Sequence, residues 1–592
     1  MEINAVEEKS PRAPKQKPVT PGSVSRDVLI TLALVLGTVY LLETNTGVTK
    51  WAQIYDPTGH WWLSTIIAGL PVILLLGAMA VFRLTAHAAA VIGLATSLIA
   101  AIVVFHMPTR MALTTTVYGA GYGLFPICWI ILPVIYLYQL TVKTGRFEAL
   151  EKTLTQITDD SRLQLLLIAF ALGAFFEGTA GFGTPVAVCG ALLISLGFNP
   201  IDAAGLSLIA NTAPVAFGAL GIPIVALHGV TGIGLGALSR TIATILVPFC
   251  ILVPFWLIWV YAGFRRMLEV WPAILVAGVT FSATQYLMAA YFGPHLVDIT
   301  AATLTIVVLV VFLRFWKPKH VLSPAREEVT GTLRERPKHG ASAIFQAWLP
   351  WLILSVVVFA WGIQKFQAWM NAATTINLTV PGLHNLVMRV PPVANTPETA
   401  PFAFNWLAAT GTGIFIAALI AGLAMGLRPK TLAWEFVKTT YNIRFAIATI
   451  AGMLALGFVM RYSGQDGTLG LAFARTGAVY PFFGALIGWL GTATTGSDTS
   501  SNVIFGTLQQ VTAHQIGVPQ TLMASANSAG GVMGKMISPS SIVVASTVTE
   551  TYGQEGTILR YVLLHSAAMA ALVGVLVYLM AYVQPFTGMV AK

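Results

Sequence analysis

The hydrophobic positions of this chain fall in long uninterrupted runs, without the alternation of a strand or the one-sided stripe of a surface helix. A helix that crosses a bilayer needs about 20 mostly apolar residues in succession. We expect thirteen spans, near residues 28–42, 61–82, 87–106, 113–140, 203–227, 241–263, 271–292, 298–315, 343–363, 405–427, 442–460, 520–545 and 561–584. The pattern therefore predicts an all-α polytopic membrane protein.

Two further apolar stretches, near 164–198 and 477–512, are broken in the middle by Gly, Thr and Ser together with a carboxylate. We interpret both as re-entrant helical hairpins, and the alternative is that each forms two ordinary spans. Broken backbone at membrane depth must be buried in protein or line a cavity, because lipid cannot satisfy its hydrogen bonds.

The sequence also contains an internal repeat. Segments 211–223 and 527–539 begin with Asn-Thr-Ala and Asn-Ser-Ala, and carry Gly and Pro at the same later positions. On the expected span count the two copies have opposite orientation in the membrane. Inverted repeats with interrupted helices are typical of secondary transporters, in which half-helix N-termini face an anionic substrate near the midplane.

The polar segments divide the chain into five parts. We expect a disordered tail at 1–27, an extra span and outer loop at 28–60, a first transporter half at 61–316, a charged loop at 317–342 and a second half at 343–592. Lys and Arg gather in alternate loops, which the positive-inside rule places in the cytoplasm. The tail, the charged loop and hence the N-terminus are expected to be cytoplasmic.

Composition excludes several other classes of protein. Of the 592 residues, 56% are hydrophobic and 9% are charged, whereas soluble chains carry about 25% charged residues. The net charge of +10 is spread over separate loops, so we expect no nucleic acid partner. Cys128, Cys189 and Cys250 lack paired spacing, and we expect neither a metal nor a cofactor. No phosphate-binding G-x-x-x-x-G-K-[ST], H-E-x-x-H or G-x-S-x-G pattern occurs, which argues against an ATP-driven pump or a hydrolase.

Five strings in the chain carry a family resemblance. They are WAQIYDPTGHWWLS at 51–64, GAFFEGTAGFGTP at 173–185, NTAPVAFGALGIP at 211–223, TGSDTSSN at 495–502 and GKMISP at 534–539. With these strings the sequence resembles the L-lactate permease family of bacterial monocarboxylate transporters, which includes glycolate permeases. A looser similarity links it to the ion-transporter superfamily, which implies paired hairpins and elevator motion.

The resemblance implies uptake of L-lactate, D-lactate or glycolate by proton symport at a bacterial inner membrane. The expected partners are thus these anions, protons and lipid, and homo-oligomer formation is left open. A sodium-coupled carboxylate symporter and a passive anion channel remain the alternatives.

Glu177 and Asp498 are the candidate proton-coupling residues. Glu177 lies at the expected tip of the first hairpin among apolar neighbours, where burial disfavours an ionised carboxylate. Asp498 lies in a polar tip rich in Thr and Ser, and a coupling role and a helix N-cap are equally compatible with it.

The candidate substrate-binding residues flank these carboxylates and mark the expected helix breaks. Lys535, beyond an expected break at 527–531, can pair with a substrate carboxylate or form a structural ion pair with Asp498. The full set is Gly178, Thr179, Gly181, Asn211, Thr212, Ser497, Thr499, Ser500, Asn527, Ser528 and Lys535.

Overall fold

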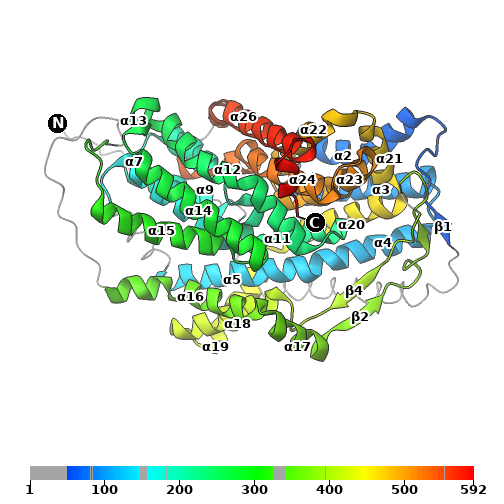
Figure 1. Cartoon of the computed structure of the whole chain (residues 1–592). Coiled ribbons are helices and arrows are strands. Elements are labelled where there is room, and N and C mark those ends of the chain that lie inside the picture. The colour runs from blue at the N-terminus through cyan, green and yellow to red at the C-terminus, as the bar shows by residue number, and fades with distance from the viewer. Residues whose placement is uncertain are drawn as a thin grey trace, which may run out of the picture.

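The computed structural model describes residues 50–80, 82, 84–146, 157–179, 181, 183–323, 341–393, 395–551 and 554–591. The expected tail, the extra span at 28–42 and residues 324–340 of the charged loop lie outside the described residues. The described part is a bundle of helices that lie mostly side by side (Figure 1). The all-α polytopic architecture expected from the sequence is thereby confirmed.

The first half supplies helices α2 to α5, the first hairpin, the first broken helix and helices α12 to α15. Its helices are α2 (Trp61–Ala80), α3 (Ala86–Ile99), α4 (Thr109–Tyr122), α5 (Trp129–Lys143), α7 (Ser161–Leu165), α8 (Gly173–Thr179), α9 (Thr184–Ser195), α10 (Pro200–Ala210), α11 (Gly218–Thr231), α12 (Leu235–Ala262), α13 (Phe264–Leu268), α14 (Trp271–Tyr291) and α15 (Val297–Phe315). A π-helical segment, Leu166–Leu172, joins α7 to α8 without a break.

The second half repeats the hairpin and the broken helix. Its helices are α16 (Ala341–Gly362), α17 (Gln364–Thr374), α18 (Thr410–Ala424), α19 (Pro429–Asn442), α20 (Arg444–Ser463), α21 (Gln465–Ala474), α22 (Tyr480–Thr495), α23 (Asp498–Ile516), α24 (Gln520–Gly534), α25 (Pro539–Val548) and α26 (Glu555–Tyr582). The strands are β1 (Trp51–Ala52), β2 (Ile376–Thr379), β3 (Val387–Met388) and β4 (Pro401–Phe404).

Among the described residues, eight helices are long and apolar enough to cross a membrane. Three further pairs of helices meet the same test together but bend by more than 40° at a short break. The expected span at 113–140 belongs to a longer path, Thr109–Lys143, that is interrupted where Phe125 leaves helical geometry. The sequence did not predict α17, α19 or the strands, because a search for uniformly apolar runs passes over amphipathic helices and short ladders. The total of thirteen spans stays a prediction.

Both expected hairpins form two helical arms that pack against each other. In the first, the Cys189 thiol on α9 donates to the Ile168 carbonyl on the incoming arm at 3.1 Å. In the second, the Ser501 hydroxyl on α23 donates to the Gly488 carbonyl on α22 at 3.0 Å. These contacts run from arm to arm, so each stretch folds back on itself. Their re-entrant placement in the bilayer stays a prediction.

The two repeated helices are both interrupted, but at different points. α10 and α11 bend by 64° around residues 211–214, and 219–221 adopt left-handed backbone angles before the helix resumes at Pro223. α24 continues through 527–531 and stops only after Gly534. The expected break at 527–531 is therefore wrong. Its polar side chains bond sideways to α23 while the helix continues, and Pro539, which suits a first helical turn, starts α25.

The two halves interlock in a reciprocal way. The outgoing arm of the first hairpin, α9, packs against α25 of the second broken helix. The outgoing arm of the second hairpin, α23, packs against α11 of the first broken helix. An inverted repeat predicts this exchange of partners, because each half presents the same surface to the other.

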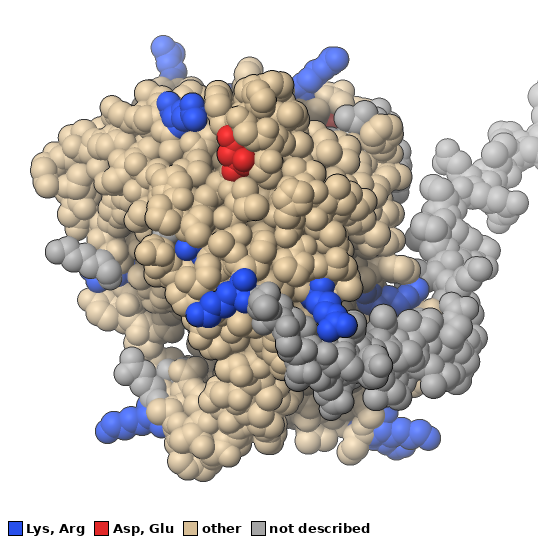
Figure 2. All heavy atoms as spheres, turned by 90° about the vertical axis from the view of Figure 1, so that its right-hand side faces the viewer, with Lys and Arg blue, Asp and Glu red and all other residues tan. Residues whose placement is uncertain are grey.

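Different segments of the chain form the two ends of the bundle. β1 pairs in parallel with β3, so residues 50–60 and the loop 376–404 share one end. Viewed onto this end, Lys and Arg side chains are scattered singly over the surface (Figure 2). At the base of the first hairpin the buried Arg162 guanidinium pairs with Asp160 at 2.8 Å and with Glu269 at 2.7 Å. These ion pairs fix the start of α7 against α13 and the segment that follows it.

Candidate functional site

A cavity of about 270 Å³ lies between the hairpin tips, the two broken helices and α20. Among the residues predicted from the sequence, its lining includes Glu177, Gly181, Ser497, Asp498, Thr499, Ser500 and Lys535. The opposite wall is formed by α20, with Ala446, Thr449, Ile450 and Met453. A cavity of this size suits a ligand of a few non-hydrogen atoms.

Helix N-termini converge on this cavity. α9 begins after Gly183, α23 begins after Ser497, and α25 begins with a turn that contains Ser540. α11 resumes its helical path at Pro223, which also lines the cavity. The N–H groups of a first helical turn have no partner inside the helix and carry partial positive charge. The cavity is therefore suited to an anion.

The Glu177 carboxyl enters the cavity from an apolar wall. It lies near the end of α8, is 5% exposed, and follows the fully buried rings of Phe175 and Phe176. A methyl group added at Gly218 would come within 2.5 Å of its Oε1 atom. Only a glycine in the broken helix therefore allows this carboxyl its present position. The buried Asn211 side chain, at the first interruption, lies close to it but forms no hydrogen bond with a described residue.

The Asp498 carboxylate enters from a polar wall. It accepts hydrogen bonds from the Ser528 hydroxyl at 2.6 Å, the Asn502 amide at 3.2 Å and the Thr492 hydroxyl at 3.4 Å. The N-cap of α23 is Ser497, so the alternative that Asp498 serves as the N-cap is wrong. Asp498 opens the outgoing arm of its hairpin, whereas Glu177 lies near the end of an incoming arm.

An amide network extends from Asp498 away from the cavity. Asn527 donates to the Asn502 side-chain oxygen at 3.0 Å and accepts from Gln509 at 3.2 Å. Asn502 in turn donates to the Pro223 carbonyl at 3.1 Å. The second hairpin, α24 and the start of the resumed α11 are thus held together by buried hydrogen bonds, which fix the position of Asp498.

Lys535 brings a cation to the same cavity. Its ammonium donates to the Gly496 carbonyl at the second hairpin tip at 2.6 Å. Its charge also interacts with both Glu177 and Asp498. The break between α24 and α25 thereby places a positive group at the same cavity as the carboxylates of the two hairpins.

The other predicted residues lie behind the lining. The Thr179 hydroxyl lies 3.4 Å from the Phe176 carbonyl, and the Thr212 hydroxyl donates to the Ile209 carbonyl at 2.7 Å. None of Gly178, Thr179, Asn211, Thr212, Asn527 and Ser528 is among the residues that line the cavity. Ser528 and Asn527 act on Asp498 directly or through Asn502, and Asn211 lies beside Glu177.

Sequence reasoning missed Asp298, in the first turn of α15. A methyl group at Gly178 would lie 2.7 Å from its Cβ atom, so α8 passes directly against it. The signal was present, since Asp298 is an isolated carboxylate next to a long apolar run. It was overlooked because it coincides with the expected start of that span.

An ion cluster between the loop 376–404 and the end of α20 closes the strand-bearing end. Glu398 in the loop pairs with Arg461 at 3.0 Å and also with Arg389. Burial alone would raise the pKa of the Glu398 carboxyl, but the guanidiniums of Arg461 and Arg389 outweigh it and hold this pKa below its ordinary value. Arg461 also donates to the Val230 carbonyl at the end of α11. This loop is thereby tied to both α20 and α11.

Apolar spans, paired hairpins, two interrupted helices and an interior cavity lined by helix N-termini together define a multi-pass membrane transporter. Within this class, the sequence model of the L-lactate permease family matches residues 64–584, and the chain belongs to that family. The family consists of permeases, so the protein is not an enzyme.

Several relatives are similar over nearly their whole length. The glycolate permease GlcA of Escherichia coli K12 is 44% identical over 563 residues, which cover 92% of this chain and 100% of the relative. The L-lactate permease of Salmonella typhimurium is 41% identical, covering 90% and 98%. That of Bacillus subtilis is 41% identical, covering 90% and 99%. Among solved structures, MtrF of Neisseria gonorrhoeae has a TM-score of 0.45 at 14% identity, with 85% and 96% covered.

Proposed function

We propose that the protein takes up L-lactate and related short 2-hydroxymonocarboxylates, D-lactate and glycolate, by proton symport. The observation that carries this proposal is the placement of Lys535 in a small cavity between Glu177 and Asp498. Relatives named as L-lactate and glycolate permeases support the substrate class.

The cavity chemistry fits such a substrate group by group. The substrate carboxylate pairs with Lys535 and with N–H groups at the starts of α23 and α25. Its 2-hydroxyl lies among the hydroxyls of Ser497, Thr499 and Ser500. A second carboxylate would meet Glu177 or Asp498, and repulsion between like charges therefore excludes dicarboxylates.

The methyl group that distinguishes lactate from glycolate contributes little. The apolar part of the lining, with Ile222, Met453 and Val544, can receive it. Burying one methyl group stabilises a complex by about 0.8 kcal/mol, so we expect the protein to accept both substrates with a preference of a few fold.

We attribute the coupling of lactate to a proton to competition between Glu177 and the substrate carboxylate for the Lys535 ammonium. Without substrate, the Lys535 ammonium compensates the negative charge of Glu177. When the substrate carboxylate pairs with Lys535, Glu177 is left as an uncompensated charge against an apolar wall and takes up a proton. Asp498 keeps its three hydrogen bonds throughout. Binding of one anion therefore brings one proton with it.

The experiment that tests this is uptake of labelled L-lactate by the purified protein in liposomes with imposed gradients. One proton with one anion moves no net charge, so the membrane potential should have no effect. Each pH unit supplies about 1.4 kcal/mol, enough for roughly tenfold accumulation. Glycolate and D-lactate should compete, and succinate or citrate should not. Accumulation driven by sodium, or equilibration without accumulation, would replace the proposal by a sodium symporter or a channel.

We further propose a bacterial cell membrane location with a cytoplasmic N-terminus, supported by the alternation of basic loops and by the separation of the two polar ends. A cysteine at Asn377, on the exposed strand β2, should react with an impermeant thiol reagent added to intact cells. A cysteine at the exposed Arg265 should react only after permeabilisation. The native cysteines are buried and give a low background. The reverse labelling pattern would overturn this orientation.

A further inference from the structure

A second buried carboxyl lies next to the first hairpin tip, outside the cavity lining. Asp298 is 1% exposed, and neither of its carboxyl oxygens receives a hydrogen bond from a described residue. Its backbone lies against Gly178, the neighbour of Glu177, so closely that a methyl group there would clash with it. The first turn of α15 therefore packs directly against α8 beside Glu177, whose charge acts on Asp298.

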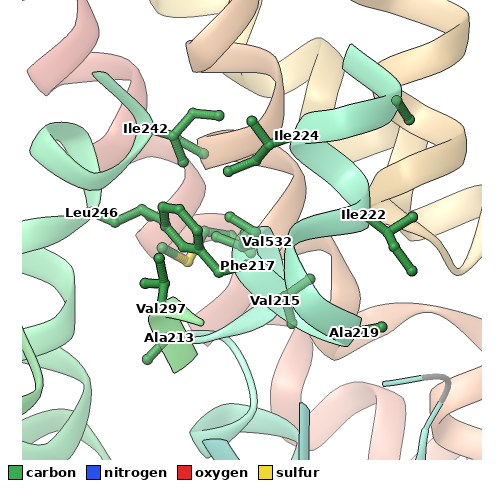
Figure 3. Packing of buried hydrophobic residues seen from close by; sticks show 14 of the residues in the cluster. Ala213, Val215, Phe217, Ala219, Ile222, Ile224, Ile242, Leu246, Val297 and Val532 are labelled. Carbon is green, nitrogen blue, oxygen red and sulfur yellow. The ribbon is translucent and has the colours of Figure 1, made fainter. Parts of the chain in front are cut away.

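The turn of α15 that carries Asp298 borders an apolar cluster. Its chain neighbour Val297 packs with Leu246 of α12 and with Phe217 and Ala213 of the first interruption (Figure 3). Polar groups nearby have other partners. Cys250 on α12 donates to Gln285 on α14 at 3.0 Å.

The titratable groups around this turn of α15 are few. They are Glu177 on α8, Cys250 on α12 and His295 in the preceding turn, whose ring contacts the Leu220 carbonyl at 3.0 Å and the Thr410 hydroxyl at 3.4 Å. Glu177 is the charged group that acts on Asp298 among the described residues, and it has the same sign. Lys535 acts on Glu177. Two adjacent carboxylates in such a place do not both ionise.

We propose that Asp298 is a second proton-binding group, which shares the coupled proton with Glu177 as a carboxyl pair. This inference rests on the proposed proton symport. Without substrate the pair holds one proton, because Lys535 compensates one negative charge. With substrate on Lys535 the pair holds two protons, and it returns to one when the substrate leaves. The two protonation steps are therefore properties of the pair and not of either carboxyl alone, as expected for strongly interacting sites.

The test is the pH dependence of lactate uptake by Asp298→Asn in liposomes. In the substrate-free pair one negative charge is shared by two carboxyls. Asp298→Asn leaves this charge on Glu177 alone, so Glu177 should take up its proton more readily, and half-maximal uptake should need about tenfold fewer protons, one pH unit higher than wild type. Exchange of lactate for lactate at saturating proton concentration reports folding. Asp202→Asn is the matched control, because Asp202 also lies in a first helical turn, that of α10, and it should keep the wild-type midpoint.

A second measurement needs no variant at Asp298. Infrared difference spectra of the wild-type protein with isotope-labelled aspartate should show a protonated aspartic acid whose carbonyl band changes when lactate is added. A wild-type pH midpoint in Asp298→Asn, or an aspartic acid band that ignores lactate, would make Asp298 a permanently protonated structural group. Failure of the proposed function is distinguishable from this, since wild-type accumulation would then not follow the proton gradient.

Discussion

The two hairpins bring their carboxylates to one cavity from opposite kinds of surroundings. Glu177 lies beside Phe176, against Gly218, with another carboxyl behind it. Asp498 receives hydrogen bonds from three side chains on three helices, backed by a further amide network. Hydrogen bonds to the ionised form stabilise it, and apolar contact disfavours it.

This difference shows how an inverted repeat can serve two tasks with one scaffold. Both halves supply a hairpin tip, a broken helix and a glycine that allows a carboxylate to approach closely. On the proposed function, the side chains around each tip assign proton uptake to Glu177 and a fixed, hydrogen-bonded place in the binding site to Asp498. Symmetry of the backbone is therefore compatible with asymmetry of the chemistry.

The largest expected effect comes from exchanging each carboxylate for its amide. Glu177→Gln keeps the neutral shape and removes titration, so pH-driven accumulation should disappear while lactate exchange survives. Asp498→Asn puts an amide where three donors converge, and we expect both accumulation and exchange to fall together, because the binding site itself is disturbed. The readouts are accumulation under an inward proton gradient and counterflow in its absence.

The same two variants would also reveal the opposite assignment, in which Asp498 and not Glu177 carries the proton. Accumulation retained by Glu177→Gln would remove the proton from the first hairpin. Accumulation lost by Asp498→Asn with exchange intact would move it to the second.

Sequence reasoning reached the fold and much of the site because membrane proteins encode both simply. Long apolar runs predict spans, and charged residues isolated within them mark candidate site residues. Glu177, Asp498 and Lys535 were singled out in this way, and the structure shows that they line one cavity. The sequence alone could not show whether a polar stretch within an apolar helix breaks that helix or contacts a neighbouring helix. The stretch 527–531 therefore looked like a break, although its Asn and Ser bond to α23 within a continuous helix.

Contacts between distant segments were beyond the reach of the sequence. The proximity of Asp298 to Gly178 depends on the packing of α15 along the first hairpin, and no local pattern records it. The same holds for the Asn502 bond to the Pro223 carbonyl, which joins the two halves.

A smaller effect is expected when the two glycines that face the carboxylates are replaced by alanine. These variants test whether the two hairpin tips differ in how firmly they hold their carboxylates. An added methyl at Gly531 would lie 2.0 Å from Asp498 Oδ1 and 2.8 Å from the Thr492 hydroxyl, where bonded neighbours leave no room to move. At Gly218 the methyl would meet Glu177 Oε1 at 2.5 Å, but that side chain borders the cavity and can swing into it. Gly531→Ala should therefore destabilise the protein by about 1–3 kcal/mol, as overpacking does, and Gly218→Ala by less.

The measurement is thermal unfolding in detergent together with lactate exchange. Gly236→Ala on α12 is the control, because nothing lies within 4 Å of its added methyl and alanine favours a helix over glycine. We expect Gly531→Ala to lower both the unfolding temperature and the rate of lactate exchange. Gly218→Ala should reduce pH-driven uptake more than it reduces stability. The control should lower neither the unfolding temperature nor lactate exchange. Equal losses of stability in Gly531→Ala and Gly218→Ala would contradict the contrast between a rigid polar tip and a movable carboxyl. The two hairpins would then hold their carboxylates with the same stiffness, and the division of roles between them would need another physical cause.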